Sequence, residues 1–333
     1  MKKRKTACTR KRPCLLKQWR KQTTGYSGMK LREIQDAILQ LKKENNVCIL
    51  AHSYQTHDIL EVADFTGDSY QLSVMAKTAP QSMIVLCGVR FMAETVKMLS
   101  PQKQVILSSP CAGCPMAEQI TPQQVADFKR KNPGFTVVAY INTSAALKTQ
   151  CDVCVTSSSA LQIVGNIKND KILFLPDRNL GSYVKKHFPE KEVVLMDGCC
   201  PVHAAITGEQ AQKSRAQHKD ALLLAHPECV PEVLKHADFV GSTSAIMQFA
   251  KQSDHQAFII GTEISIAQHL QYACPEKSFY PLSSRLLCPD MKATSLIDVL
   301  HCVQGTGGEE IIMEEEQRIA AVRCINKMIE LGG

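Results

Sequence analysis

Three cysteines of this sequence occupy equivalent places in an internal repeat. Cys114 and Cys200 are 86 residues apart, Cys200 and Cys288 are 88 residues apart, and each follows the last apolar run of its repeat. Three thiolates do not complete a structural zinc site, which takes four ligands, but they can hold a four-iron, four-sulfur cluster with one iron left open. Such an iron is a Lewis acid that binds carboxylate or hydroxyl oxygens. The spacing therefore predicts one cluster held between the repeats by these three cysteines.

The other cysteines leave alternatives open. Two CxxC pairs, at residues 111–114 and 151–154, are compatible with a four-cysteine zinc site or a dithiol switch. A CxxC pair alone is a weak signal, the second pair falls within an expected strand, and neither pair explains the two later cysteines of the set. We interpret Cys199, which is out of register, and Cys87, which falls on an expected strand, as packing or supporting thiols.

Polar side chains recur where the expected strands end. The first strand of each repeat ends in two polar residues, and the turn after the second strand carries a hydroxyl. Ligands bind at the carboxyl ends of parallel strands, so we expect all of these side chains to face one cavity that binds a small anion. Alternatively, each hydroxyl caps a helix. The residues are His52 and Tyr54, Tyr140 and Asn142, His226 and Glu228, and the hydroxyl-bearing Ser69, Ser157 and Thr243.

A repeated α/β unit must position these residues. Short runs rich in Val, Ile and Leu alternate with helical patterns, which is typical of βαβ units with a parallel sheet. Segments of one design, ADFTGDSYQLSVMA from Ala63, CDVCVTSSSALQIV from Cys151 and ADFVGSTSAIMQFA from Ala237, are 88 and 86 residues apart. We therefore expect an α/β protein of three pseudo-threefold-related lobes, each a small parallel sheet flanked by helices, around the central iron–sulfur cluster.

The same offsets predict the domain boundaries. Lobe 1 covers residues 29–113, lobe 2 residues 114–199 and lobe 3 residues 200–287. Residues 288–333 are expected to form a C-terminal helical wrap that packs on the lobes through an apolar stripe. The stripe consists of Ile319, Val322, Ile325 and Ile329.

The first 28 residues differ from the rest of the chain in charge. They carry ten Lys or Arg and no acid, whereas the remainder has 29 basic against 32 acidic residues. We interpret residues 1–28 as a basic disordered extension, or as the product of an upstream start codon with the real start at Met29. The tail lacks the apolar core of a signal peptide, and no segment is apolar enough to cross a bilayer, so we expect a soluble protein without membrane association.

Composition separates the remaining function classes. Fifteen cysteines without a secretory signal favour reduced thiols in the cytoplasm over a disulfide framework. Aromatic residues make up 5% of the chain and the body carries a net negative charge, so stacking platforms and a basic groove for nucleic acid are lacking. A zinc- or thiol-dependent redox regulator remains as the alternative function.

Ten ordered motifs give the sequence a close resemblance to the quinolinate synthase family, which makes the pyridine precursor of NAD. The resemblance runs from Leu31 to Ile329. The first cysteine loop varies in this family and is PCAGCPM here, so Cys111 competes with Cys114 as a ligand, and the repeat register favours Cys114. The motifs are AHSYQ, ADFTGDS, GVRFMAET, AYINTSAA, VTSSSA, LPDRNLGSYV, GCCPVH, HPEC, VGSTS and CPDMKA.

The resemblance implies an activity, a cofactor and a residue set. The family condenses iminoaspartate with dihydroxyacetone phosphate to quinolinate, with one four-iron, four-sulfur cluster held by three cysteines, which correspond here to Cys114, Cys200 and Cys288. It also implies an aspartate-oxidising enzyme as the upstream supplier of iminoaspartate. The residues implied to contact substrate are His52, Tyr54, Ser69, Tyr140, Asn142, Ser157, His203, His226, Glu228, Ser242 and Thr243.

Several steps of that condensation move protons next to carbonyl or imine groups, so the site needs acids and bases. We expect Glu228, beside His226, to be the principal general base, and Tyr54 and Tyr140 to shuttle protons to and from the carbonyl oxygen of the triose. The hydroxyls and imidazoles of the cavity are expected to hold carboxylates and phosphate.

Overall fold

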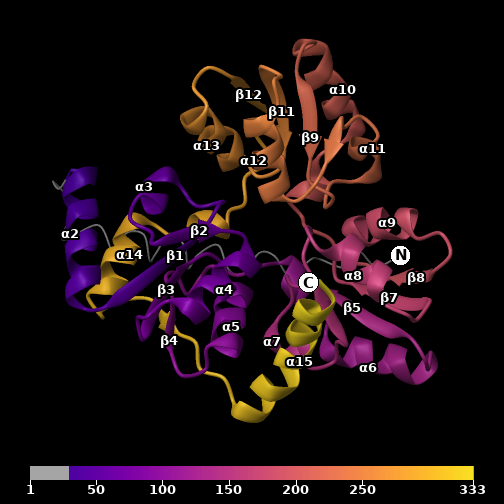
Figure 1. Cartoon of the computed structure of the whole chain (residues 1–333), viewed down its shortest axis with the longest axis horizontal. Coiled ribbons are helices and arrows are strands. Elements are labelled where there is room, and N and C mark those ends of the chain that lie inside the picture. The colour runs from indigo at the N-terminus through magenta and orange to yellow at the C-terminus, as the bar shows by residue number, and fades with distance from the viewer. Residues whose placement is uncertain (1–29, 333) are drawn as a thin grey trace, which may run out of the picture.

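The computed structural model describes residues 30–332, which form three parallel sheets flanked by helices (Figure 1). The predicted basic extension at residues 1–28 lies outside the described residues. Lobe 1, drawn in indigo and purple, lies opposite the magenta lobe 2, and the orange lobe 3 stands above both. The α/β class and the three sheets predicted from the sequence are confirmed.

Lobe 1 holds the first sheet. Its helices are α2 (Leu31–Glu44), α3 (His57–Leu60), α4 (Ser69–Thr78) and α5 (Arg90–Leu99), and its strands are β1 (Val47–His52), β2 (Phe65–Gly67), β3 (Met83–Cys87) and β4 (Gln104–Leu107).

Lobes 2 and 3 repeat this order of elements. Lobe 2 contains η2 (Met116–Glu118), α6 (Pro122–Lys131), β5 (Thr136–Tyr140), α7 (Ala145–Lys148), β6 (Val153–Val155), α8 (Ala160–Asn166), β7 (Lys171–Leu175), α9 (Arg178–His187) and β8 (Glu192–Leu195). Lobe 3 contains η3 (His203–Ala205), α10 (Gly208–Gln217), β9 (Leu222–Ala225), α11 (Pro231–Leu234), β10 (Phe239–Val240), α12 (Thr243–Gln252), β11 (Ala257–Gly261), α13 (Ser265–Ala273) and β12 (Ser278–Pro281).

The three sheets share one strand order. They run β2-β1-β3-β4, β6-β5-β7-β8 and β10-β9-β11-β12, and the pairs within these orders are parallel. The apolar runs found in the sequence coincide with strands: MIVLC is β3, and the runs at 137–140 and 172–175 lie within β5 and β7. These strands are buried almost throughout because helices cover the sheets, which explains their continuous apolar pattern.

Each lobe uses the same aspartate to join its first two strands. This residue is the Asp at the second position of the repeated segment, and it lies just before the second strand. Its carboxylate accepts a main-chain N–H near the start of the first strand and pairs with a basic side chain. The bonds join Ile49 N to Asp64, Val137 N to Asp152 and Leu223 N to Asp238, all at 2.7 Å, and the basic partners are Lys42, Lys129 and Arg215.

A second shared device is a largely buried lysine just before the fourth strand of each sheet. Its ammonium group donates to main-chain carbonyls at the end of the helix that follows the second strand. Carbonyls at a helix C-terminus lack partners within the helix, and the positive charge also suits the helix dipole. The lysines are Lys103, Lys191 and Lys277, again 88 and 86 residues apart, and their acceptors include Ala76 O, Ile167 O and Ala250 O.

The C-terminal segment combines a turn of 3-10 helix, η4 (Met291–Ala293), with two α-helices and a short strand. Helix α14 (Leu296–Val303) packs on α2, strand β13 (Glu309–Glu310) pairs antiparallel with β4, and α15 (Glu315–Gly332) crosses from α5 to lobe 2, where it covers β6. In Figure 1 the yellow α15 lies between lobes 1 and 2.

The predicted apolar stripe of α15 is confirmed for Ile325, which is fully buried, and for Val322, which packs against the core, but it is wrong for Ile319 and Ile329. Ile319 and Ile329 are exposed, at 45% and 42%. Together with Ile325, the buried face consists of Ala321, Cys324 and Met328. Its small residues allow a close approach to β6, where the sulfurs of Cys154 and Cys324 are 3.2 Å apart.

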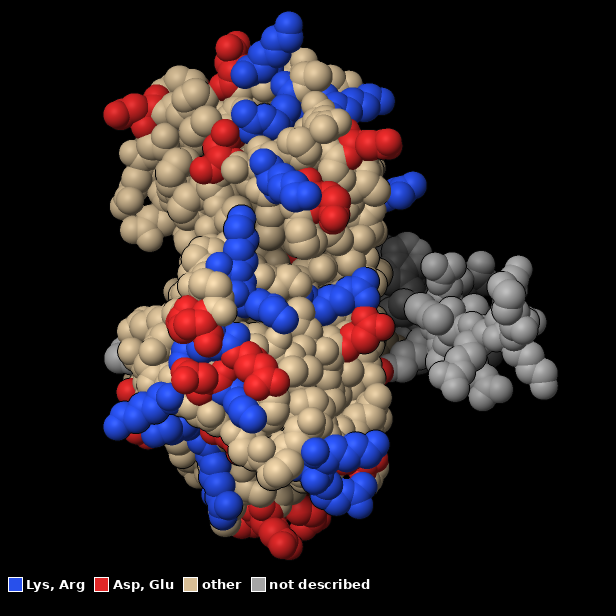
Figure 2. All heavy atoms as spheres, turned by 90° about the vertical axis from the view of Figure 1, so that its right-hand side faces the viewer, with Lys and Arg blue, Asp and Glu red and all other residues tan. Residues whose placement is uncertain are grey.

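Surface charge is mixed on the face drawn in Figure 2. Basic and acidic side chains lie next to one another over that face, so it has no large area of a single sign. Among the helices described, none combines the length and the apolar character needed to cross a membrane.

Candidate functional site

The carboxyl ends of the three sheets open into one cavity of about 730 Å³. The three predicted ligand cysteines, Cys114, Cys200 and Cys288, all line it, although they come from loops far apart in the sequence. Ser242 is the one predicted contact residue that is absent from the lining. The other predicted residues that line the cavity are His52, Tyr54, Ser69, Tyr140, Asn142, Ser157, His203, His226, Glu228 and Thr243.

The three cysteine loops have the same local structure. Each cysteine precedes a single turn of 3-10 helix, and its sulfur accepts the N–H of the residue three positions later. The bonds join Ala117 N–H to Cys114, His203 N–H to Cys200 and Met291 N–H to Cys288.

The main chain confirms the repeat register at these loops. In each lobe the residue two positions before the cysteine accepts an N–H from the segment after the third strand. Cys111 has no such place in the register, although it also lines the cavity. The bonds run from Arg90 to Ala112, from Arg178 to Gly198 and from Ile264 to Leu286, at 2.9, 2.7 and 2.7 Å.

Burial controls the protonation of these thiols. It raises the pKa of Cys114 and of Cys200 well above the ordinary thiol value, and it raises the pKa of Cys288 to about 11. Neighbouring sulfurs add to the effect, because Cys288 acts on Cys114 and Cys114 acts on Cys200. Deprotonation of these thiols would therefore require a compensating positive charge, such as that of a bound metal.

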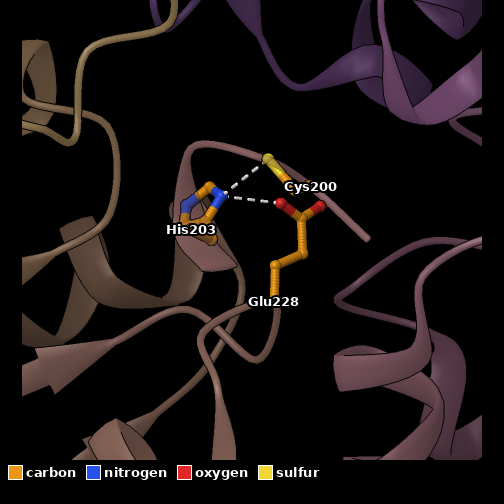
Figure 3. Close-up of side chains that lie close together, drawn as sticks. All are labelled: Cys200, His203 and Glu228. Atoms are coloured by element: carbon orange, nitrogen blue, oxygen red, sulfur yellow. Dashed lines mark hydrogen bonds and ion pairs between the residues drawn. The ribbon is translucent and has the colours of Figure 1, made fainter. Parts of the chain in front are cut away.

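His203 joins one of these cysteines to the main acid of the cavity. Its Nδ1 lies 3.2 Å from Cys200 Sγ and 2.8 Å from a carboxylate oxygen of Glu228, and the ring is almost fully buried (Figure 3). These three residues form the one group of His, Cys and acidic side chains, among the described residues, close enough to share a metal ion. The sequence predicted Cys200 as a cluster ligand and Glu228 as a general base, and the structure places both of them beside His203.

A chain of hydrogen bonds leads from His203 to lobe 1. Its Nε2 lies 3.1 Å from the hydroxyl of Thr262, which lies 2.9 Å from the phenol of Tyr54. The same phenol lies 2.8 Å from the hydroxyl of Thr243. Thr262 is fully buried and absent from the predicted set, because nothing in the repeat marks it. Its position fixes Tyr54 relative to lobe 3.

The two strand-end histidines are neutral. Burial lowers the pKa of His52 to about 3 and that of His226 to about 4. In each ring Nδ1 accepts a main-chain N–H two residues later, from Tyr54 at 3.1 Å and from Glu228 at 3.3 Å. The proton of each neutral ring is therefore on Nε2, and each imidazole has one N–H to donate to a ligand.

Glu228 is ionised and hydrogen-bonded in a buried position. Burial alone would raise its pKa, but the charge of His203 and hydrogen bonds from His203 and Tyr140 lower it to about 2. Burial and the charge of Glu228 keep the pKa of the Tyr140 phenol well above its usual value, and burial does the same for Tyr54. The cavity therefore combines two protonated phenols with a carboxylate that accepts hydrogen bonds.

The predicted alternative that Ser69, Ser157 and Thr243 cap their helices is wrong. Helices α4 and α12 are capped by Asp68 and Ser242, so Ser69 and Thr243 are the first helical residues. Ser157 lies three residues before α8 begins. All three hydroxyls line the cavity, whereas that of Ser242 accepts the N–H of Ala245.

Arg285 is the only Lys or Arg that lines the cavity within residues 30–332. It lies on the loop that leads to Cys288, its side chain is exposed, and its guanidinium makes no hydrogen bond or ion pair with the described chain. Sequence reasoning missed it because Arg285 has no counterpart among the repeat motifs. A free guanidinium at the edge of a cavity is suited to binding carboxylate or phosphate.

Comparison with known proteins agrees with this geometry. The family model described as Quinolinate synthetase A protein matches residues 36–330. Quinolinate synthase of Caldicellulosiruptor bescii is 44% identical over 304 residues, covering 91% of this chain and 100% of the relative. Those of Alkaliphilus metalliredigens and Clostridium acetobutylicum are each 45% identical, covering 89% and 90% of this chain and 97% and 99% of theirs. The chain therefore belongs to the quinolinate synthetase A family and is an enzyme of the quinolinate synthase kind.

Proposed function

We propose that this enzyme condenses iminoaspartate with dihydroxyacetone phosphate to quinolinate, releasing phosphate and water, in the de novo synthesis of NAD. The observation that carries the proposal is the single cavity in which three register-equivalent cysteines meet strand-end side chains of all three lobes. Family membership supports the same activity. The cavity is within the usual size range of small-molecule sites.

Cys114, Cys200 and Cys288 would hold one four-iron, four-sulfur cluster. The donor set fits, because all three sulfurs line one cavity and each accepts a main-chain N–H that stabilises a thiolate. When bound, a cluster with three protein ligands supplies an open iron, which is a Lewis acid for substrate oxygens. Cys111 remains the competing ligand in the first loop, and the shared loop geometry favours Cys114.

The substrates bring two carboxylates and a phosphate into the cavity. Arg285 supplies a full positive charge, and the neutral His52 and His226 supply one N–H each. The hydroxyls of Ser69 and Thr243 lie at the N-termini of α4 and α12, where free main-chain N–H groups favour anions. Ser157, Asn142 and His203 complete the set of polar contacts, and Ser242 supports it by capping α12.

The phenols and Glu228 would carry the proton transfers. Tyr54 and Tyr140 are protonated, so each can donate a proton to a carbonyl oxygen and recover it later. Glu228 is ionised and accepts a hydrogen bond from Tyr140, so it orients the phenol as a proton donor and can itself accept a proton from the substrate. The neutral His226 lies beside Glu228 and holds its main chain through Nδ1.

We place the enzyme in the cytoplasm, where an aspartate-oxidising enzyme would supply iminoaspartate. The described residues contain thirteen cysteines and no disulfide bond, which fits a reducing compartment.

The proposal is tested by purification without oxygen. The protein should be brown, contain about four irons per chain, and form quinolinate from iminoaspartate and dihydroxyacetone phosphate. Zinc in place of iron, with no quinolinate formed, would replace the proposal by the zinc- or thiol-dependent regulator. A brown protein that forms no quinolinate would support the proposed cluster and contradict the proposed substrates.

A further inference from the structure

Two buried acids occupy equivalent places in lobes 2 and 3. Asp177 follows β7 and Glu263 follows β11, and they are 86 residues apart, the offset that relates these two lobes. Both side chains are completely buried. No step of the proposed reaction uses them, and the residue at the equivalent place in lobe 1 is Val89.

Each acid bridges a helix N-terminus and a ligand cysteine. One oxygen of Asp177 accepts the N–H of Leu180 at 2.7 Å, and the other accepts the N–H of Cys200 at 2.8 Å. One oxygen of Glu263 accepts the N–H of Ser265 at 2.9 Å.

The other oxygen of Glu263 faces Cys288. It lies 3.4 Å from the main-chain nitrogen of that cysteine and 3.1 Å from the ammonium of Lys292. Both carboxylates therefore use their two oxygens as acceptors.

Helix capping alone does not require such residues. Helices α6, α10 and α14 are capped by Thr121, Thr207 and Ser295, which are small hydroxyl residues. A buried carboxylate costs more free energy than a hydroxyl unless all its oxygens are hydrogen-bonded. The second oxygen is the feature that a hydroxyl cap lacks, and in both lobes it is directed at the cysteine.

We infer that Asp177 and Glu263 are positioning residues of the metal site, which hold the main chain at Cys200 and Cys288 in the ligating conformation. The inference rests on the proposed cluster site and deepens it. Lobe 1 has no acid at this place, so the loop of Cys114 is held by one anchor fewer. A buried carboxylate thus holds the main chain at Cys200 and at Cys288, whereas no equivalent acid holds it at Cys114.

The test uses amide variants of both acids. An amide has one acceptor oxygen, so Asp177→Asn and Glu263→Gln each set an NH₂ group against a main-chain N–H. The readouts are iron per chain after anaerobic reconstitution and the rate at which an iron chelator bleaches the visible spectrum. We expect each variant to lose its cluster roughly tenfold faster, the factor that corresponds to one hydrogen bond to a charged group.

Asp152→Asn is the matched control. Asp152 also accepts a main-chain N–H in lobe 2, at 2.7 Å, but at the opposite end of the sheet from the cavity. It should lower the melting temperature of the metal-free protein without changing the rate of bleaching. Asp177→Glu, which introduces the residue type found in lobe 3, should lose its cluster more slowly than Asp177→Asn. It provides the test if Asp177→Asn fails to fold.

The outcomes are distinct. Amide variants that bleach at the rate of the unmodified protein would overturn the inference. Equal loss of iron in Asp152→Asn would also overturn it, because the effect would then be general destabilisation. An unmodified protein that binds no iron would instead reject the cluster and the proposed function with it.

Discussion

The two ends of each lobe differ in how strictly they keep the repeat. At the amino ends of the strands, all three lobes carry the same aspartate and the same buried lysine, with the same acceptors. At the carboxyl ends, equivalent residues differ in chemistry. The sets there are His52, Tyr140 and His226; Tyr54, Asn142 and Glu228; and Val89, Asp177 and Glu263.

The difference follows from what each end must do. Joining strands and closing helix ends poses the same physical problem in every lobe, so one solution is used three times. The substrates have no threefold symmetry, and each lobe therefore presents different groups to the cavity. At the cavity end the cysteines remain identical, as does the proline that follows each of them. Identical cysteines fit the proposed cluster, which would need three similar ligands.

The largest effect should come from the cysteines that remain identical. Replacing Cys114, Cys200 or Cys288 singly with Ala should abolish both the brown colour and quinolinate formation, since the cluster loses a ligand. Iron content and the visible spectrum of anaerobically purified protein provide the measurement. Cys87→Ala is the control, because Cys87 is fully buried in the core of lobe 1 and should affect stability alone.

The first loop offers a sharper form of that experiment. Cys111 lines the cavity but stands outside the repeat. If Cys111→Ala bleaches the protein while Cys114→Ala leaves it brown, Cys111 is the ligand and the repeat register does not identify it. The rule that equivalent cysteines bind the cluster in all three lobes would then be wrong for lobe 1.

Glu228→Gln should have the next largest effect. The amide is nearly isosteric, so fold and cluster should remain, but it takes up no proton at neutral pH and accepts hydrogen bonds through one oxygen. Loss of a general base typically lowers the rate by about a hundredfold to ten-thousandfold. Anaerobic turnover is measured beside the iron content. Near-normal turnover with a full cluster would move the base to Tyr54 or Tyr140.

Arg285→Gln should have a smaller effect that is confined to binding. Loss of the one cationic Lys or Arg side chain among the described cavity residues should raise KM for dihydroxyacetone phosphate by roughly tenfold, with little change in kcat, because a charged hydrogen bond contributes about 1.5–3 kcal/mol when desolvated and less at an exposed rim. Steady-state kinetics at varied triose phosphate provide the measurement. Lys219→Gln, an exposed charge of lobe 3 outside the cavity lining, should leave KM unchanged.

Residues that repeat with the offsets of 86 and 88 were accessible from the sequence. The three sheets, their apolar runs and the gathering of strand-end side chains were predicted this way, because equivalent positions in equivalent folds face the same space. Asp177 and Glu263 also keep the offset, yet Val89 in lobe 1 breaks the series, so a search for threefold identity missed them.

Other features depend on packing between elements that no local pattern records. The buried face of α15 is set by close approach to β6 through Ala321 and Cys324, whereas the larger Ile319 and Ile329 point to solvent. Thr262 acquires its role only because Tyr54 and His203 arrive from different parts of the chain. The helix caps escaped prediction by one residue at α4 and α12, since either of two adjacent polar residues suits an N-cap.

Lys277→Met should have the smallest effect on catalysis. The Lys277 ammonium donates to the carbonyls of Ala250, Lys251 and Ser253 at 2.9, 3.2 and 2.6 Å, so the variant leaves the end of α12 without these partners. Unsatisfied buried acceptors cost about 1–3 kcal/mol, which urea unfolding of the metal-free protein would measure. Activity per folded molecule should stay normal, because the contact lies at the opposite end of the sheet from the cavity. A drop in kcat at full iron content would show that the two ends of the lobe are coupled, and the division between a shared structural end and a specialised catalytic end would then be wrong.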